Sequence, residues 1–223
     1  MAITAKSGGE ARQLAPEGNY FGICTGVYDL GTQPSQKYEP THKVLLEFEL
    51  HKKKGPAVDK ENRPLRVTGF YPLAFGKRKN GEKAKLRQAV ESILGRTFTD
   101  EEAKSGYDVT QLAEVCCRLR VTHDSGEDGG NKYEVLSFQP LDEDDPEPKT
   151  EANITVYELD PQQEIPSEVP DWIKKMIRKS AEWVKVHGQP RDDDNGKKPA
   201  AKNGSGNGKG TKPADDDDDS IPF

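Results

Sequence analysis

The alternation of apolar and polar residues predicts five β-strands in the first two thirds of the chain. Residues 43–51 place Val44, Leu46, Phe48 and Leu50 on one face, and mostly polar residues on the other, which is typical of a half-buried strand. The same criterion predicts strands over residues 18–30, 63–71, 113–123 and 132–139. Residues 124–131 (DSGEDGGN), before the last strand, are a strong hairpin signal.

The same alternation predicts which side chains share a face. In the first strand we expect Phe21, Ile23 and Val27 to face away from Tyr20, Cys24 and Tyr28, with Gly22 and Gly26 permitting a bend or bulge. In the third, Leu65, Val67 and Gly69 oppose Arg66, Thr68 and Phe70. In the fourth, Val115, Cys117, Leu119 and Val121 oppose Arg118 and Arg120.

A helix is expected between the third and fourth strands. In residues 82–94, Leu86, Ala89, Val90 and Ile93 recur at helical spacing, and Gly95 is a natural stop. Three strands, a helix and two strands is the element order of the OB-fold, a five-stranded Greek-key barrel that binds oligonucleotides. The pattern therefore favours a mainly β fold, an OB-fold-like barrel with helices, although another small five-stranded barrel fits it as well.

The C-terminal third begins with a second helix and ends in a polar tail. Residues 170–187 form an amphipathic pattern with Asp171 as the expected cap; the helix either docks on the body or lies on a membrane surface, and docking is favoured. From Gly188 onward the chain holds almost no apolar residue before its last three. We expect a flexible N-terminus (1–15), one folded domain (16–187), a disordered linker (188–214) and a distinct tip (215–223).

Composition supports a folded body with polar appendages. Only 32% of the 223 residues are hydrophobic and the mean hydropathy is −0.91, which is too polar for one fully packed globule. There is no apolar run of the roughly 18 residues that a membrane span needs, and the first residues lack the apolar core of a signal peptide, so a soluble cytoplasmic protein is expected. The cysteines, Cys24, Cys116 and Cys117, and the scattered histidines suggest neither a disulfide framework nor a metal site.

The charge is unevenly distributed along the chain. Lys and Arg number 33 against 39 Asp and Glu, a net charge of −6. Residues 42–96 nevertheless hold 14 basic and 6 acidic residues, whereas residues 141–223 have a net charge of −8. A basic body joined to an acidic tail suits a protein that binds a polyanion with one part and a basic partner, or itself, with the other.

The last residues, DDDDDSIPF, place the tail's large apolar side chains at the terminal carboxylate behind an aspartate run. This ending resembles the acidic tip of bacterial single-stranded DNA-binding proteins, with Ser220 inserted. The resemblance implies that Phe223 enters a hydrophobic pocket on a replication or repair protein, with support from Ile221 and Pro222. It also implies that the aspartates guide the tip along a basic rim. The implied partner-binding residues are Asp215, Asp216, Asp217, Asp218, Asp219, Ile221, Pro222 and Phe223.

A second resemblance covers roughly residues 15–187. The turn Gly95, Arg96, Phe98, Thr99, Glu101 and Glu102, the strand ending in His123, and the segment Pro170–Ile173 are similar in layout to phage-encoded OB-fold single-stranded DNA-binding proteins. The resemblance implies an OB-fold and a role in phage DNA replication or recombination, in the cytoplasm of the bacterial host.

The residues themselves also suggest nucleic-acid binding. Single strands are held by a basic groove along the phosphates and by aromatic rings under the bases. Residues 69–87 interleave rings and cations, residues 52–54 form a basic hairpin tip, and two arginines occupy the polar face of the fourth strand. The expected DNA-binding residues are Lys52, Lys53, Lys54, Arg66, Phe70, Tyr71, Phe75, Lys77, Arg78, Lys79, Lys83, Lys85, Arg87, Arg118 and Arg120.

Each of these residues also has a structural alternative. The rings could be core or rim packing, the lysines a solvated loop, and the two arginines surface charges or cross-strand partners of Glu134. No cofactor, metal or catalytic grouping is expected. The function predicted is single-strand coverage with partner recruitment through the tip, which could also fold back on the body and compete with DNA. A protein adaptor of the replication machinery and a Mg²⁺-dependent DNA-processing enzyme are the alternatives.

Overall fold

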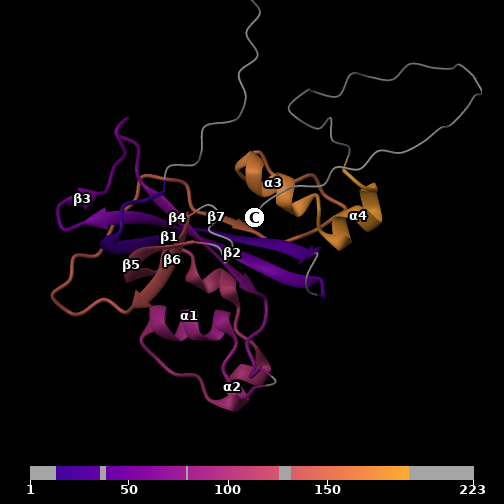
Figure 1. The fold of residues 1–223 in the computed structure, drawn as a ribbon, viewed down its shortest axis with the longest axis horizontal. Coiled ribbons are helices and arrows are strands. Elements are labelled where there is room, and N and C mark those ends of the chain that lie inside the picture. The colour runs from indigo at the N-terminus through magenta and orange to yellow at the C-terminus, as the bar shows by residue number, and fades with distance from the viewer. Residues whose placement is uncertain (1–13, 36–38, 79, 126–131, 191–223) are drawn as a thin grey trace, which may run out of the picture.

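The computed structural model describes residues 14–35, 39–78, 80–125 and 132–190. Within these residues the fold is one mainly antiparallel sheet in the order β3-β2-β1-β5-β6, with β4 paired to β2 and the short β7 parallel to β1 (Figure 1). The strands are β1 (Gly18–Gln33), β2 (Thr41–Lys52), β3 (Gly55–Pro56), β4 (Arg66–Pro72), β5 (Cys116–Ser125), β6 (Lys132–Gln139) and β7 (Thr155–Tyr157). The prediction of a mainly β fold is confirmed.

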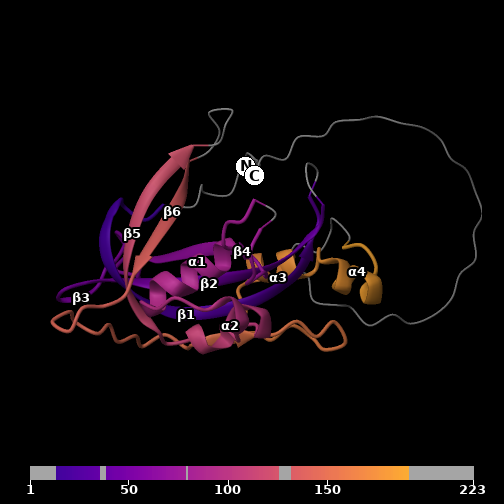
Figure 2. The ribbon, with the colours of Figure 1, turned by 90° about the horizontal axis from the view of Figure 1, so that it is seen from below.

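The sheet curls around a first hydrophobic core. β5 and β6 form a hairpin that stands away from the long, curved β1 and β2, and α1 (Lys85–Leu94) lies in the concavity (Figure 2). Phe48 of β2 and Phe138 of β6 meet across this core, with ring centroids 5.1 Å apart. β4 and β6 are not joined by a ladder, so among the described strands the curl does not close into a complete barrel.

The predicted helix at 82–94 is present as α1, and it ends as expected at Gly95, whose φ of 64° suits glycine. The short α2 (Asp100–Ser105) then begins with a capping box between Thr99 and Glu102. The Arg96 guanidinium lies 4.0 Å from the Phe98 ring centroid. The turn that carries part of the family resemblance is therefore built to end one helix and start the next, before a 3-10 turn at Val109–Leu112.

The predicted single helix at 170–187 is two helices, α3 (Asp171–Ile177) and α4 (Ala181–His187). The break occurs because the Ser180 side chain accepts a hydrogen bond from the Trp183 amide, 3.3 Å away, and caps a new helix. The expected cap, Asp171, is instead the first residue of α3. Both helices pack against β1, so the expectation that this segment docks on the body is confirmed.

A bulge in β1 makes the predicted facing wrong for Val27 and Tyr28, whereas Phe21 and Ile23 oppose Tyr20 and Cys24 as predicted. The pairing of β1 with β2 shifts between Cys24 and Gly26 and again between Asp29 and Gly31. Each extra residue reverses the alternation, so Tyr20, Cys24 and Val27 share the first core while Tyr28 belongs to a second. A side chain at Gly26 would collide with the Tyr28 ring, which explains the glycine that the sequence marked as a bulge.

β2 is buried on both faces, not on one as predicted. Val44, Leu46, Phe48 and Leu50 face the first core, whereas Leu45 joins a second core with Tyr28, Leu30 and the α3 residues Ile173 and Ile177. The residues that were expected to face solvent, Glu47, Glu49 and His51, are buried. The reason is that the chain after β6 returns across this face, where the Thr150 hydroxyl donates a hydrogen bond of 3.0 Å to Glu49.

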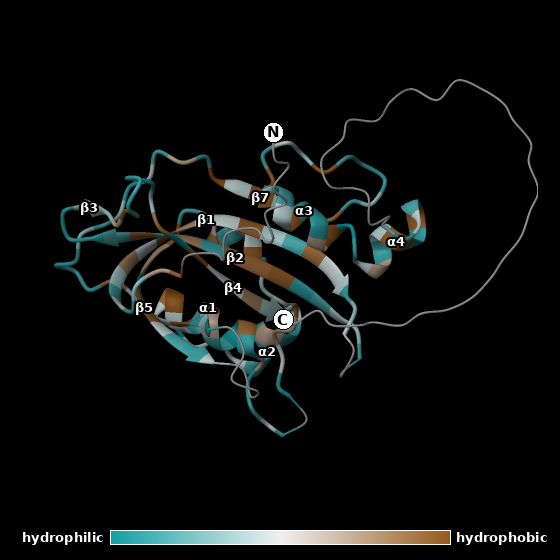
Figure 3. Ribbon diagram, turned by 45° about the horizontal axis from the view of Figure 1, so that its top comes forward, coloured by the Kyte–Doolittle hydropathy of each residue, from teal (hydrophilic) through white to brown (hydrophobic). Residues whose placement is uncertain are grey.

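Smaller features complete the comparison with the sequence. The three cysteine thiols are free. Cys24 and Cys117 lie in the first core, and burial raises the pKa of Cys24 to about 12. Ala15, which was assigned to a flexible N-terminus, is buried, and its amide donates to Glu134 at 2.7 Å. Figure 3 shows hydrophobic residues along β1 and β2, and more hydrophilic residues on β3 and β5.

Candidate nucleic-acid interface

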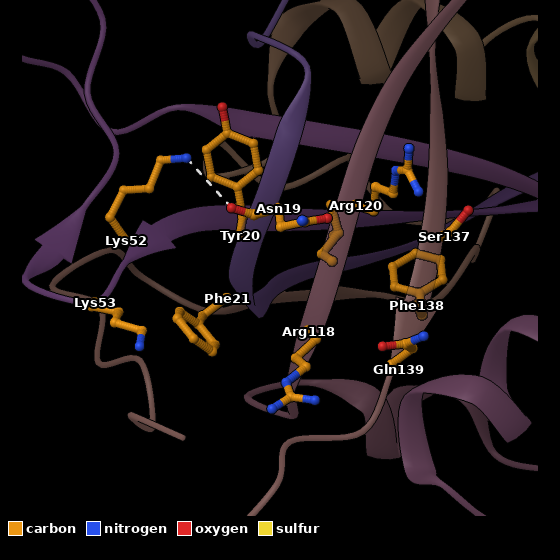
Figure 4. Close-up of a pocket in the computed structure, with 11 residues that line it drawn as sticks. Asn19, Tyr20, Phe21, Lys52, Lys53, Arg118, Arg120, Ser137, Phe138 and Gln139 are labelled. Atoms are coloured by element: carbon orange, nitrogen blue, oxygen red, sulfur yellow. Dashed lines mark hydrogen bonds between the residues drawn. The ribbon is translucent and has the colours of Figure 1, made fainter. Parts of the chain in front are cut away.

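A groove of about 600 Å³ lies where β1, β5 and β6 meet the end of β2 (Figure 4). We call it the basic groove, because its lining includes four cationic side chains and no carboxylate. It is lined by Asn19, Tyr20, Phe21, Lys52, Lys53, Arg118, Leu119, Arg120, Ser137, Phe138 and Gln139. Of the predicted DNA-binding residues, it brings together Lys52, Lys53, Arg118 and Arg120.

Strand register builds this groove. Arg118 of β5 lies opposite Phe21 on one side and Gln139 on the other, and Arg120 lies opposite Asn19 and Ser137. Residues two apart on a strand share a face, so these six side chains form two parallel rows across three strands. The alternate residues of β5, Cys117, Leu119 and Val121, are buried in the first core, as the sequence predicted.

Lys52 is held at the rim of the groove by neutral groups. Its Nζ lies 3.6 Å from the centroid of the Tyr20 ring and 3.4 Å from the Asn19 carbonyl oxygen. The Tyr20 hydroxyl in turn donates to the Pro16 carbonyl at 2.8 Å, and burial raises its pKa. A cation fixed by a ring and a carbonyl keeps its full charge for an incoming anion.

Arg118 carries carboxylate partners from the segment after β6. Its Nε lies 2.5 Å from Asp145, and its guanidinium also pairs with Asp142. The hydrogen bond from Arg118 holds the pKa of Asp145 below its usual range, with a smaller contribution from Lys53. The alternative of pairing with Glu134 is wrong for Arg118, since Glu134 lies opposite His123.

The strand face that carries Arg120 and Ser137 extends beyond the groove along the β5–β6 hairpin. Beyond Arg120 and Ser137, the same face carries the pairs Thr122–Val135 and Asp124–Tyr133. The Tyr133 side chain is 48% exposed, one of the few large aromatic residues in the described chain that solvent reaches so freely. The hairpin therefore presents cations near the body and an exposed ring farther out.

Acidic residues pair with several cations of the segment 77–87, where DNA-binding residues were predicted. Lys77 pairs with Asp100 at 2.7 Å, Arg78 with Glu82 at 3.9 Å and Lys83 with Glu91 at 2.6 Å. Burial alone would raise the pKa of Glu91, but the hydrogen bonds from Lys83 and Arg87 outweigh it and hold that pKa below its usual range. Lys85 is exposed at the start of α1, and Lys79 lies outside the described residues.

Arg87 was predicted to contact DNA, but only 2% of its side chain is exposed, so it cannot do so. It pairs with Glu91 at 3.0 Å, reaches Asp100 at 3.5 Å and donates to the Phe98 carbonyl. These contacts tie α1 to the turn before α2, so the role of Arg87 is structural.

The three aromatic residues of 69–87 that were predicted to bind DNA lie in different environments. Tyr71 packs against the first core, and burial raises its pKa. Phe75 stacks on the Tyr107 ring, at a centroid distance of 5.6 Å, and meets the Phe98 ring edge-to-face at 5.0 Å. Phe70 alone of the three is exposed, and it lies on the opposite face of β4 from Tyr71.

The remaining predicted residues lie beside the groove or outside the described chain. Lys54 is exposed in the turn after Lys53, and Arg66 rests on the buried Glu47 and Glu49, at 3.2 and 4.0 Å. The partner-binding set at 215–223 falls outside the described residues. The sequence did not identify four residues that line the groove, Asn19, Phe21, Ser137 and Gln139. Their position beside Arg118 and Arg120 follows only from the pairing of β1 and β6 with β5.

Comparisons with family models and with curated proteins gave no match to this chain. Among the described residues, no helix is long and apolar enough to cross a membrane, and no three His, Cys, Asp or Glu side chains are grouped as metal ligands.

Proposed function

We propose that this chain is a single-stranded DNA-binding protein that covers single strands without strong sequence preference during phage DNA replication or recombination. Its place of action would be the cytoplasm of the bacterial host. The observation that carries the proposal is the basic groove, where Arg118, Arg120 and the Phe21 ring share one face of the sheet and Lys52 and Lys53 lie at the end of β2. Partner recruitment through residues 215–223 is part of the proposal and rests on the sequence of the tip alone.

We propose further that the curled sheet is an OB-type barrel left partly open. Its spatial order β5-β1-β2-β4 is that of a Greek key, in which the fourth strand returns to lie beside the first. The returning connection carries α1, and β6 follows as a hairpin. The OB-fold is itself a partly open barrel that binds oligonucleotides on a strand face.

The groove has the chemistry that single strands require. Lys52, Lys53 and Arg120 can face phosphates, while the Phe21 ring offers a stacking surface for a base, worth about 1–3 kcal/mol. The neutral polar side chains of Asn19, Ser137 and Gln139 can donate to or accept from any base or sugar. Three to four neutralised phosphates would give log K against log [salt] a slope of about −2 to −3.

The test is fluorescence anisotropy of labelled oligo-dT, with labelled duplex as the comparison, across a salt series. We expect single-strand binding that exceeds duplex binding and weakens with salt. Arg120→Ala should make the slope about 0.7 shallower, whereas Lys104→Ala, an exposed lysine on α2, serves as the matched control. Phe21→Leu, which keeps apolar volume without a ring, should weaken binding at every salt concentration.

Two outcomes would replace the proposal. If neither the full chain nor a variant lacking residues 215–223 binds oligo-dT, a protein adaptor becomes the better interpretation. If the chain cleaves the labelled strand when Mg²⁺ is added, it is a DNA-processing enzyme.

A further inference from the structure

Two exposed aromatic rings from distant parts of the sequence meet outside the basic groove. Phe70 of β4 and Trp172 of α3 are 43% and 41% exposed, and their ring centroids lie 6.4 Å apart at an interplanar angle of 64°. Docking of α3 does not depend on Trp172, because Ile173 and Ile177 are the residues fully buried in the second core. The indole thus stays at the surface next to Phe70.

These rings lie on the same face of the sheet as the basic groove. Phe70 is paired with Leu45 of β2, and His51, six residues farther along β2, is paired with Phe21 of the groove. An even separation on a strand keeps the face, and six residues at about 3.4 Å each correspond to about 20 Å. Arg66, four residues before Phe70, is on this face as well and is half-exposed between the two places.

The charges beside the rings suit a polyanion. Lys43 shares the face of Leu45, two residues away on β2, and Lys175 follows Trp172 by one turn of α3. The carboxylate next to Trp172, Asp171, lies 3.8 Å from the Lys174 ammonium group. An edge-to-face pair uses only one face of one ring, so another ring face remains available to a stacking partner.

We infer that Phe70 and Trp172 form a second base-stacking platform, which holds a nucleobase of the same single strand that occupies the basic groove. The inference rests on the proposed function. It adds that the bound strand runs from the basic groove along the β4 edge of the sheet, past Arg66, to the ring pair, because the chain after β6 covers the middle of this face. A single-stranded polynucleotide is the occupant because it alone alternates flat π surfaces with phosphates, matching rings that stand between cations.

The direct test is tryptophan fluorescence. The chain has two tryptophans, and Trp183 stacks on His187 at a centroid distance of 4.2 Å, so Trp183→Phe leaves Trp172 as the only indole. Titration of this full-length variant with oligo-dT of about 16 nucleotides should quench Trp172 in step with the anisotropy change. An oligonucleotide of about 4 nucleotides, long enough for the groove only, should bind more weakly and quench little.

Two substitutions separate stacking from packing. Trp172→Leu should weaken binding of the longer oligonucleotide about 5- to 150-fold, the range expected for one stacked base, and leave binding of the short one unchanged. Trp172→Phe, which keeps a ring, should restore most of the loss. If the longer oligonucleotide binds with no quenching, or with equal affinity to Trp172→Leu, the platform is refuted and the proposed function stands. If no oligonucleotide binds, the proposed function fails first, and the platform with it.

Discussion

The carboxylates of Asp142 and Asp145 form ion pairs with the Arg118 guanidinium, and removal of their charges should strengthen DNA binding. Asp142→Asn combined with Asp145→Asn keeps an acceptor oxygen at each position and removes two negative charges from the edge of the basic groove. Arg118 could then neutralise one more phosphate, which would make the salt slope about 0.7 steeper. If the variant and the wild type bind equally at 1 M salt, the variant should bind about eightfold more tightly at 50 mM. Between 200 and 50 mM salt, the affinity of the variant should rise about 2.6-fold more than that of the wild type.

The assay is oligo-dT anisotropy at several salt concentrations, with circular dichroism to confirm that the fold is unchanged. A double variant of equal charge change, Glu101→Gln with Glu164→Gln, is the control, since both glutamates are exposed and neither lines the groove. It should tighten binding much less. The reasoning is refuted if the aspartate variant binds no more tightly than this control, or if its salt slope matches that of wild type.

Two further predictions follow from the same contacts. Arg87→Met should lower the free energy of unfolding in urea by about 1–3 kcal/mol, because it removes the Arg87 donor to the Phe98 carbonyl and one of the donors to Glu91. The DNA affinity of the folded variant should not change, and weaker binding at full stability would contradict the structural role. Deletion of residues 215–223 should tighten oligo-dT binding at low salt if the acidic tip competes for the basic groove; equal or lower affinity in the same anisotropy assay would show that it does not.

Local pattern was sufficient for most elements. β6 has the bounds that the sequence predicts, residues 132–139, because a clean alternation follows a strong turn signal. α1 ends at the predicted glycine, since Gly95 adopts a φ of 64° that other residues avoid. The outward facing of Arg118 and Arg120 was predicted for the same reason: β5 has no bulge to disturb its alternation in this stretch.

Pairing between distant residues could not be predicted. The basic groove depends on β1 lying beside β5, a contact between residues about a hundred positions apart, and no local feature of either strand specifies it. The sequence of 77–87 did not reveal the acidic partners of its cations, because Glu91 and Asp100 reach Lys83 and Lys77 only after α1 and the following turn have folded together. The bulge between Cys24 and Gly26 reversed the facing of Val27 and Tyr28 relative to Tyr20 and Cys24, in a way that a glycine permits but does not require.

The sharing of β1 and β2 by both hydrophobic cores has a consequence for how the body unfolds. Leu46 and Leu45 are adjacent in sequence, yet one belongs to each core, so loss of either core removes the support of the same two strands. The region from Ala15 to His187 should therefore melt in a single cooperative transition, although its two cores lie on opposite sides of the sheet. Truncation after β6 would strip α3 from Tyr28, Leu30 and Leu45, and the shortened chain would expose an apolar strip prone to self-association.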